Sequence, residues 1–396
     1  MTTYPLPAAA AAKTAAPKFH IPYHEPFFDE REEQSVVEAV RSGYTQGGGK
    51  FTKQVEAAIR ARTGAQHALV TTSGTHALEL AMMVLNLGPG DEVIVPSYTF
   101  AATASCVVRQ MARVVFCDVR RDNLNIDVAD FARRITPKTK AVIPVHYAGI
   151  ACDMDELLEV ARRRGIAVVE DAAQSFDTTY RGRQLGTLGE IGCLSFHGTK
   201  NVAAGEGGAF LTNDSSLARR AEILREKGTD RAQFLRGEID KYTWRDVGSS
   251  FIPSELVMAL LSAQLSKIDQ IQTRRVAIFD RYMLALAPLA KEGRIGLPHV
   301  PAGSRPNAHI FYFFAKHLAD RDRYYEALRT RGIQAMLHYT PLDDSPFGAQ
   351  FRAAGEAPLP AARWVTDCML RLPLFVRMTD AQVEEVIGAV TELARP

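Results

Sequence analysis

The amino-acid sequence predicts an α/β protein in which helices flank a mostly parallel β-sheet. Several short runs are continuously apolar, and this pattern indicates strands that are buried on both faces. A helical pattern with Leu78, Met82 and Leu85 on one side precedes these runs, and the runs then alternate with helices. The predicted strands are 92–95, 113–119, 141–145, 166–169 and 192–196.

The length predicts more than one domain. A chain of 396 residues is too long for one ordinary hydrophobic core. We expect a disordered tail over residues 1–20, which are rich in Ala and Pro, and a large α/β domain over 21–260. Residues 261–396 are then predicted to form a linking helix and a small C-terminal α+β domain.

The first elements of the large domain can be placed from local signals. Asp29 can cap a helix whose third residue, Glu32, reaches back to the cap. The glycine-rich stretch 43–49 is predicted to be a loop, and a short helix is expected over 54–62.

The C-terminal part begins with a long helical pattern over 254–286. Strands are expected near 309–315 and 333–339, and a last helix begins at Thr379 with Gln382 in the capping position.

Bulk composition excludes several classes of protein. A net charge of +2 and a pI near 8.2 give no electrostatic reason to expect binding to nucleic acid or to a membrane surface. No apolar run approaches the roughly 20 residues of a membrane-spanning helix. The cysteines are scattered and lack a C-x-x-C pair, which argues against a zinc site or disulfides and favours a reducing cytoplasm. They are Cys106, Cys117, Cys152, Cys193 and Cys368.

An acid and a lysine lie where two neighbouring strands end. Asp171 follows the strand at 166–169, and Lys200 follows the strand at 192–196. Ligands of parallel sheets gather at such strand ends. Pyridoxal phosphate (PLP) needs an amine to hold its aldehyde and a carboxylate to keep its ring nitrogen protonated. We therefore interpret Lys200 as that amine and Asp171 as that carboxylate, against the alternatives of a surface lysine and a helix-capping acid.

Three further features fit such a site, each with a structural alternative. Residues 73–76 place small hydroxyl groups at a helix start, which binds anions through free N–H groups, although plain N-capping gives the same pattern. Phe100 follows a strand and could stack on a ring, or it could be a core aromatic. His197 could polarise a sugar hydroxyl, or it could be a structural histidine.

Taken together, the motifs resemble a known family, the DegT-type sugar-nucleotide aminotransferases of PLP-dependent transferase fold type I, which is aspartate aminotransferase-like. The resemblance extends from about Pro22 to the C-terminus. It is carried by SGTHAL at 73–78, PGDEVIVPSYTF at 89–100, PVHYAG at 144–149, EDAAQ at 170–174, SFHGTKN at 195–201 and EGG at 206–208.

The resemblance implies roles for individual residues. Lys200 would bind the cofactor covalently and Asp171 would pair with its ring nitrogen. Gln174 would bind the ring hydroxyl, and Phe100 would stack on the ring. The residues expected against the phosphate are Ser73, Gly74, Thr75, His76 and Ser195. Those expected near the substrate are His197, His309 and Tyr339.

Two positions depart from the family pattern. Ser250 stands where many members have an asparagine that reaches the phosphate of the neighbouring subunit, and its hydroxyl could make the same contact. In the stretch 338–343, His338 and Tyr339 match the family, but Asp343 stands where a histidine is usual.

The stretch 226–250 resembles one branch of the family, which aminates the 4-keto group of dTDP-4-keto-6-deoxyglucose with glutamate and gives the galacto amino sugar. By resemblance we expect L-glutamate and a nucleotide sugar as substrates, PLP as cofactor, and a cytoplasmic homodimer with shared sites. Another keto sugar nucleotide remains an alternative. PLP-dependent sugar dehydratases are a weaker one, because they carry histidine where this chain has Lys200.

Overall fold

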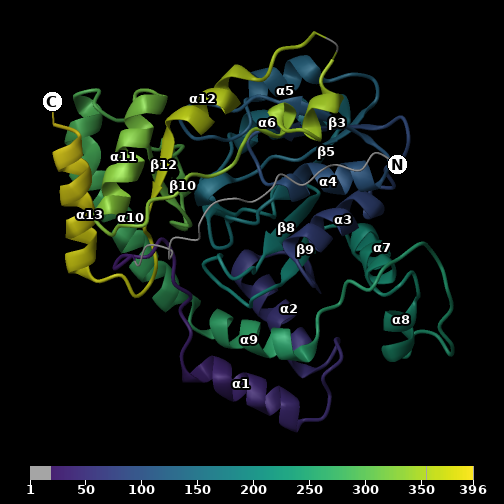
Figure 1. The fold of residues 1–396 in the computed structure, drawn as a ribbon. Coiled ribbons are helices and arrows are strands. Elements are labelled where there is room, and N and C mark those ends of the chain that lie inside the picture. Colours follow the sequence, from purple (N-terminus) through teal and green to yellow (C-terminus); the bar gives the residue numbers. More distant parts are fainter. Residues whose placement is uncertain (1–18, 354, 396) are drawn as a thin grey trace, which may run out of the picture.

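The structure is a computed structural model that describes residues 19–353 and 355–395 (Figure 1). Apart from Phe19 and His20, the predicted tail at 1–20 lies outside the described residues. The domain boundary at 260/261 stays a prediction.

A seven-stranded sheet forms the centre of the molecule, in the order β1-β9-β8-β5-β4-β2-β3. Only β9 runs antiparallel to its neighbours, so the prediction of a mostly parallel sheet is confirmed. The strands are β1 (His67–Thr71), β2 (Glu92–Pro96), β3 (Arg113–Cys117), β4 (Thr139–Val142), β5 (Ala167–Asp171), β8 (Ile191–Ser195) and β9 (Gly208–Thr212).

Helices cover both faces of this sheet, as Figure 1 shows. Successive strand residues point to opposite faces, so Val93 and Val95 join one core while Ile94 joins another. The first face packs against α3 (Gly74–Val84), α4 (Ala101–Arg109) and α7 (Ser215–Arg225). The second packs against α2 (Lys50–Thr63), α5 (Val128–Arg134), α6 (Met154–Arg164) and α9 (Glu255–Ser266).

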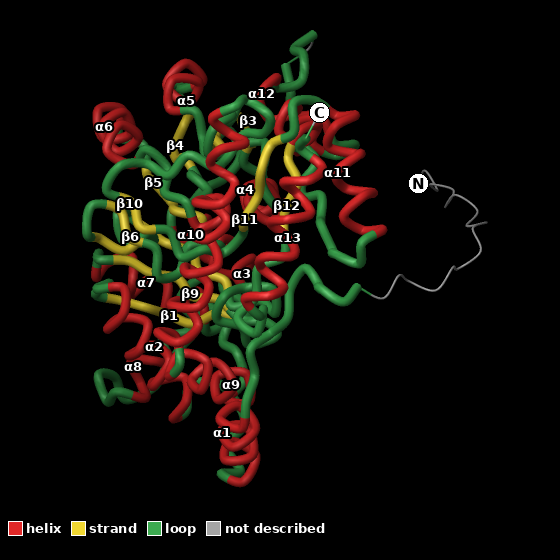
Figure 2. The backbone as a smooth tube through the Cα atoms, turned by 90° about the vertical axis from the view of Figure 1, so that its left-hand side faces the viewer, coloured by secondary structure: helices red, strands yellow, loops and turns green. Residues whose placement is uncertain are grey.

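The C-terminal part has a core of its own around the two-stranded sheet of β11 (Phe311–Phe314) and β12 (Met369–Leu372). It lies at the left of Figure 1 and therefore faces the viewer in Figure 2. Its helices are α10 (Ile268–Lys291), α11 (Leu318–Thr330) and α13 (Asp380–Leu393), whereas α12 (Pro360–Cys368) packs on the core of the large sheet. A small sheet joins β6 (Thr179–Tyr180), β7 (Arg183–Gln184) and β10 (Ser304–Arg305).

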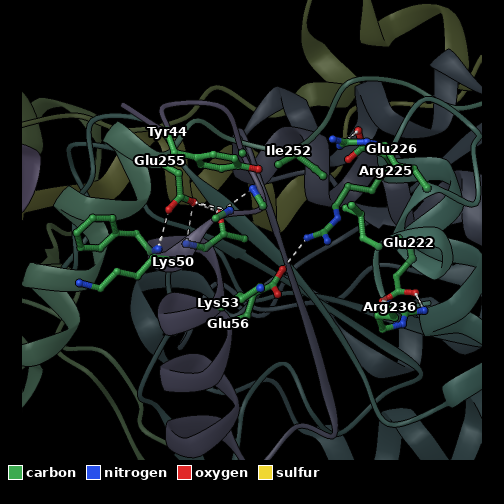
Figure 3. A pocket seen from close by; sticks show the side chains of 18 of the residues that line it. Tyr44, Lys50, Lys53, Glu56, Glu222, Arg225, Glu226, Arg236, Ile252 and Glu255 are labelled. Carbon is green, nitrogen blue, oxygen red and sulfur yellow. Dashed lines mark hydrogen bonds and ion pairs between the residues drawn. The ribbon is translucent and has the colours of Figure 1, made fainter. Parts of the chain in front are cut away.

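Both predicted capping boxes are present. Asp29 and Glu32 cap α1 (Glu30–Arg41), and Thr379 and Gln382 cap α13. Helix α2 begins at Lys50, before the predicted start at 54. Its cap, Gly49, has no side chain, and Glu255 supplies the missing acceptor (Figure 3).

Two predictions for the C-terminal part are wrong. The long helix predicted over 254–286 is two helices that meet at Lys267, whose fully buried ammonium binds Glu32 and Asp29 of the α1 start. The strand predicted over 333–339 is absent. Only single bridges form there, from Ile333 to Ile21 and from Met336 to Arg371.

Within the described residues, no helix combines the length and the apolar character that crossing a bilayer demands.

Candidate active site

Asp171 is the last residue of β5, and its carboxylate is buried at the strand end, with 5% of the residue exposed. Oδ2 accepts a hydrogen bond from Thr103 Oγ1 at 2.8 Å, and Oδ1 accepts one from the Ala173 amide at 3.1 Å. Burial raises the pKa of the Asp171 carboxyl, while the Thr103 and Ala173 hydrogen bonds and the field of Lys200 act against this rise. The carboxylate is thus oriented by a neutral hydroxyl and an amide.

Lys200 lies in the turn that follows β8, where its amide donates to His197 O at 2.8 Å. The side chain is half-buried. Burial lowers the pKa of the Lys200 amine to about 8, and Asp171 partly opposes this shift. At neutral pH a substantial fraction of this amine is therefore unprotonated and able to act as a nucleophile or a base.

The start of α3 lies beside Ser195 and presents free backbone N–H groups. Ser73 caps the helix by accepting from the His76 amide at 3.1 Å, and this leaves the N–H groups of Gly74 and Thr75 without an acceptor in the described chain. A Cβ on Gly74 would lie 2.8 Å from Ser195 Cβ, so only glycine lets the helix start approach the end of β8. The start of α3 and Ser195, which are the two parts of the predicted phosphate site, are therefore adjacent.

Gln174 and Tyr339 link the large sheet to the C-terminal part. Gln174 Oε1 accepts from the Ala148 amide at 2.7 Å, and its Nε2 donates to Tyr339 OH at 3.2 Å. The Tyr339 ring stacks on His338, with centroids 3.6 Å apart. Phe100 lies 6.1 Å from the Tyr339 ring and is 58% exposed, so its ring face is available to a ligand.

His309 shares a small cavity with Lys200, Gln174 and Ser195. Its Nδ1 lies 3.0 Å from Asn201 Oδ1, and burial together with the field of Lys200 holds the pKa of His309 well below its usual value. Residues from three separate stretches of the sequence, 170–174, 195–201 and 307–309, thus meet at one place.

Of the predicted site residues, Gln174, Ser195, Lys200 and His309 line that cavity, and His197 and Ser250 are exposed outside it. His197 is exposed in the turn before Lys200, where its Nδ1 faces Thr199 Oγ1 at 2.9 Å. Ser250 is exposed and forms a backbone bridge with Glu226. The next residue, Phe251, accepts from the Thr72 amide at 2.9 Å, so Ser250 lies near the helix start.

The sequence reasoning missed Thr103, Asn201 and a structural use of Asp343. Asp343 is fully buried, binds the Ser97 hydroxyl, and accepts from the Leu359 amide at 2.9 Å. It ties the loop with Tyr339 to the turn after β2. The departure from the family pattern at 343 marked this position, whereas no sequence signal distinguished Thr103 from other helical threonines.

A larger cavity, about 770 Å³ in volume, lies elsewhere, between the glycine-rich loop and α7–α8 (α8, Arg231–Leu235) (Figure 3). Its ionic groups largely neutralise one another: Arg225 pairs with Glu56 at 2.7 Å and Arg236 with Glu222 at 3.0 Å. None of the predicted site residues lines it. The chemistry points to the Lys200 site, where an amine of lowered pKa lies within the electrostatic field of a buried carboxylate.

Residues 26–391 match the DegT/DnrJ/EryC1/StrS aminotransferase family. GDP-perosamine synthase of Caulobacter vibrioides is 34% identical over 373 residues, which cover 93% of this chain and 96% of that protein. The structure of S. venezuelae DesV has a TM-score of 0.86 at 33% identity, covering 95% and 99% of the two chains. Spr1654 from Streptococcus pneumoniae, in its PLP form, has a TM-score of 0.85 at 27% identity, covering 94% and 98%.

Proposed function

Because the chain belongs to the DegT/DnrJ/EryC1/StrS aminotransferase family, we propose that it transfers the amino group of L-glutamate to a keto group of a nucleotide-linked sugar. The observation that carries the proposal is that Lys200, an amine whose pKa burial lowers to about 8, lies within the electrostatic field of the buried Asp171 carboxylate. A transaminase needs both groups, since one must move protons and the other must stabilise positive charge on a bound ring.

The cofactor of this reaction is pyridoxal phosphate, which would supply an electron sink when bound. The residues present fit it. The N–H groups of Gly74 and Thr75 and the Ser195 hydroxyl would hold its phosphate, as the close packing of Gly74 against Ser195 allows. Asp171 would keep the ring nitrogen protonated, and Phe100 would cover a ring face.

Lys200 would hold the cofactor covalently between turnovers and would act as the base and then the acid during them. Its amine would take the proton from Cα of glutamate and return a proton to the sugar carbon that receives the amino group. Gln174 is positioned by the Ala148 amide and would orient the ring hydroxyl. Tyr339, which receives the Gln174 amide hydrogen bond, and His309 would contact the substrate.

For the sugar we propose dTDP-4-keto-6-deoxy-D-glucose, aminated at C4 to the galacto product. The support is the resemblance of 226–250 to the branch with that activity. The name of the relative from Caulobacter carries GDP, so the nucleotide is the variable that the assay must test.

We further propose a homodimer in which Ser250 contacts the phosphate of the partner's site. The support is that Ser250 occupies the position of the family asparagine that reaches the neighbouring subunit and that Ser250 is exposed. Light scattering should give twice the mass of the chain, and a fully active monomer would contradict this part.

The activity test incubates the purified enzyme with PLP, L-glutamate and the 4-keto-6-deoxy sugar linked to dTDP, UDP or GDP. We expect an amino sugar and 2-oxoglutarate in equal amounts, with dTDP preferred. A product that has lost a further hydroxyl group and gained no amino group would indicate a dehydratase instead. Lys200→Ala should abolish turnover, whereas Lys291→Ala, at an exposed lysine, should not. Turnover of Lys200→Ala near the wild-type rate would overturn the assignment.

A further inference from the structure

Thr103 is a fully buried residue of α4 whose hydroxyl points at Asp171. Thr103 Oγ1 lies 2.8 Å from Asp171 Oδ2, and Thr99 Oγ1 lies 2.9 Å from Thr103 Oγ1. Thr99 is itself only 2% exposed. The two hydroxyls and the carboxylate therefore form one chain of hydrogen bonds from which water is excluded.

The direction of this chain follows from its chemistry. An ionised carboxylate only accepts hydrogen bonds, so the single hydroxyl proton of Thr103 is committed to Asp171. Thr103 Oγ1 must then accept from Thr99 Oγ1. Each donor polarises the next one, and the chain ends on Asp171 Oδ2.

Within the described part of the chain, the ionised form of Asp171 is not stabilised by a neighbouring cation. Among the described residues no lysine, arginine or histidine lies within ion-pair distance of its carboxylate. The ionised form is stabilised locally by the Thr103 hydroxyl and the Ala173 amide. Titratable groups further away contribute only through their fields, and they are Lys200, His146, Tyr339, Cys106 and Cys193.

The start of α4 contributes residues to two sides of the proposed site for the cofactor ring. Phe100 is the N-cap residue of α4, and the Thr103 amide donates to its carbonyl at 3.1 Å. The turn that presents Phe100 to a ring face thus presents Thr103 to the carboxylate at the ring nitrogen.

We propose that Thr103, backed by Thr99, is a positioning residue that keeps Asp171 ionised and aimed at the pyridine nitrogen of the cofactor. The proposal rests on the function proposed above. It predicts that the hydroxyl of Thr103 contributes to cofactor affinity through Asp171 alone.

The test measures PLP binding to the apo-enzyme by fluorescence titration. Thr103→Val, which keeps the shape and removes the hydroxyl, should raise the Kd for PLP about 10- to 100-fold, as expected for a lost hydrogen bond to a charged group. Thr103→Ser should restore binding to within about 3-fold, and Thr99→Val should have a smaller effect than Thr103→Val. The control is Thr63→Val, since Thr63 is also buried and donates to Ile59 O at 2.8 Å far from the site.

A double-mutant cycle separates positioning from packing. In an Asp171→Asn background, adding Thr103→Val should change the PLP Kd by less than about 2-fold, because the charge it serves is gone. Melting of each apo-variant shows whether it folds. Unchanged PLP affinity in folded Thr103→Val, or an undiminished effect in the Asp171→Asn background, would overturn the inference. Failure of the wild type to bind PLP would instead overturn the proposed function.

Discussion

At the scale of single residues, burial shifts the pKa values of the two charged groups of the site in opposite directions. Burial disfavours the charged form of each group, so it lowers the pKa of Lys200 and raises that of Asp171. Their mutual attraction and the Thr103 hydrogen bond oppose these shifts. The result is an amine that is partly neutral near a carboxylate whose ionised form is stabilised by hydrogen bonds.

The lowered pKa of Lys200 can be measured on the apo-enzyme. With a pKa of about 8, about one amine in ten is neutral at pH 7, against about one in 2,500 for an ordinary lysine. We expect Lys200 to be acylated by a small reagent such as acetic anhydride with a midpoint near pH 8. Mass spectrometry of peptides would follow it, with exposed Lys291 as the internal reference.

The sign of the Asp171 effect gives a second measurement on the same peptides. Asp171 raises the pKa of Lys200, so Asp171→Asn should move the labelling midpoint of Lys200 to lower pH. A Lys200 midpoint as high as that of Lys291, or a shift to higher pH in the variant, would contradict this account.

At the scale of elements, local signals predicted much of the structure and long-range contacts decided the rest. The predicted strand with residues 92–95 is wholly buried in β2, because its apolar residues alternate between two cores. The antiparallel strand β9 went unrecognised, since its pairing depends on neighbours far away in the sequence. Likewise Asp171 and Lys200 were identifiable from their positions after strands, while Thr103 contacts Asp171 only through tertiary packing.

The break between α9 and α10 shows one such long-range contact. Lys267 Nζ lies 2.7 Å from Glu32 Oε1 and 3.1 Å from Asp29 Oδ2, and its side chain is fully buried. Glu32 also accepts from Gln264 Nε2 at 2.7 Å. A buried charge group of this kind fixes where α1 lies on α9, because each partner left alone would be an unpaired charge.

Removing the Lys267 ammonium alone should therefore lower the free energy of unfolding more than removing both charges of the Lys267–Glu32 pair. We expect Lys267→Met to lower the free energy of unfolding by about 3–5 kcal/mol, because it leaves the Glu32 carboxylate buried without its partner. Adding Glu32→Gln should restore at least about 1 kcal/mol, since glutamine keeps the cap on Asp29 without a charge. Urea unfolding midpoints of the two variants would measure the difference.

The control for this comparison is Lys50→Met, which breaks an exposed ion pair with Glu38 and should change stability by no more than about 0.5 kcal/mol. If Lys267→Met costs no more than Lys50→Met, or if the double variant is the least stable, the assigned role of this buried pair is incorrect.

At the scale of the whole molecule, the segment 19–29 runs from the C-terminal part to α1 (Figure 1). Ile21 packs in the C-terminal core, and Tyr23 OH accepts from Arg371 at 2.7 Å. His24 Nε2 then contacts Gly198 O at 3.0 Å, in the turn that carries Lys200. This contact joins the C-terminal part, the site turn and the first helix through one stretch of chain.

The partial burial of His24 makes the free energy of unfolding depend on pH in a predictable direction. Burial and the field of Arg275 lower the pKa of His24 to about 4, whereas the unfolded chain has an ordinary value of about 6.5. Between these values the unfolded state binds more protons than the folded state, so stability falls as pH decreases through this window. The loss from His24 alone is at most about 3.5 kcal/mol, because each unit of a pKa difference of about 2.5 is worth about 1.4 kcal/mol.

Comparing the wild type with His24→Gln isolates this contribution, since other carboxylates and histidines titrate equally in both proteins. We expect the difference in unfolding free energy, wild type minus variant, to be constant above about pH 7 and to decrease steadily between about pH 6.5 and 4. His317→Gln, at an exposed histidine on the surface of the C-terminal part, serves as the control and should run parallel to the wild type. Parallel curves for wild type and His24→Gln over this range would show that the folded state does not hold His24 half-buried and neutral.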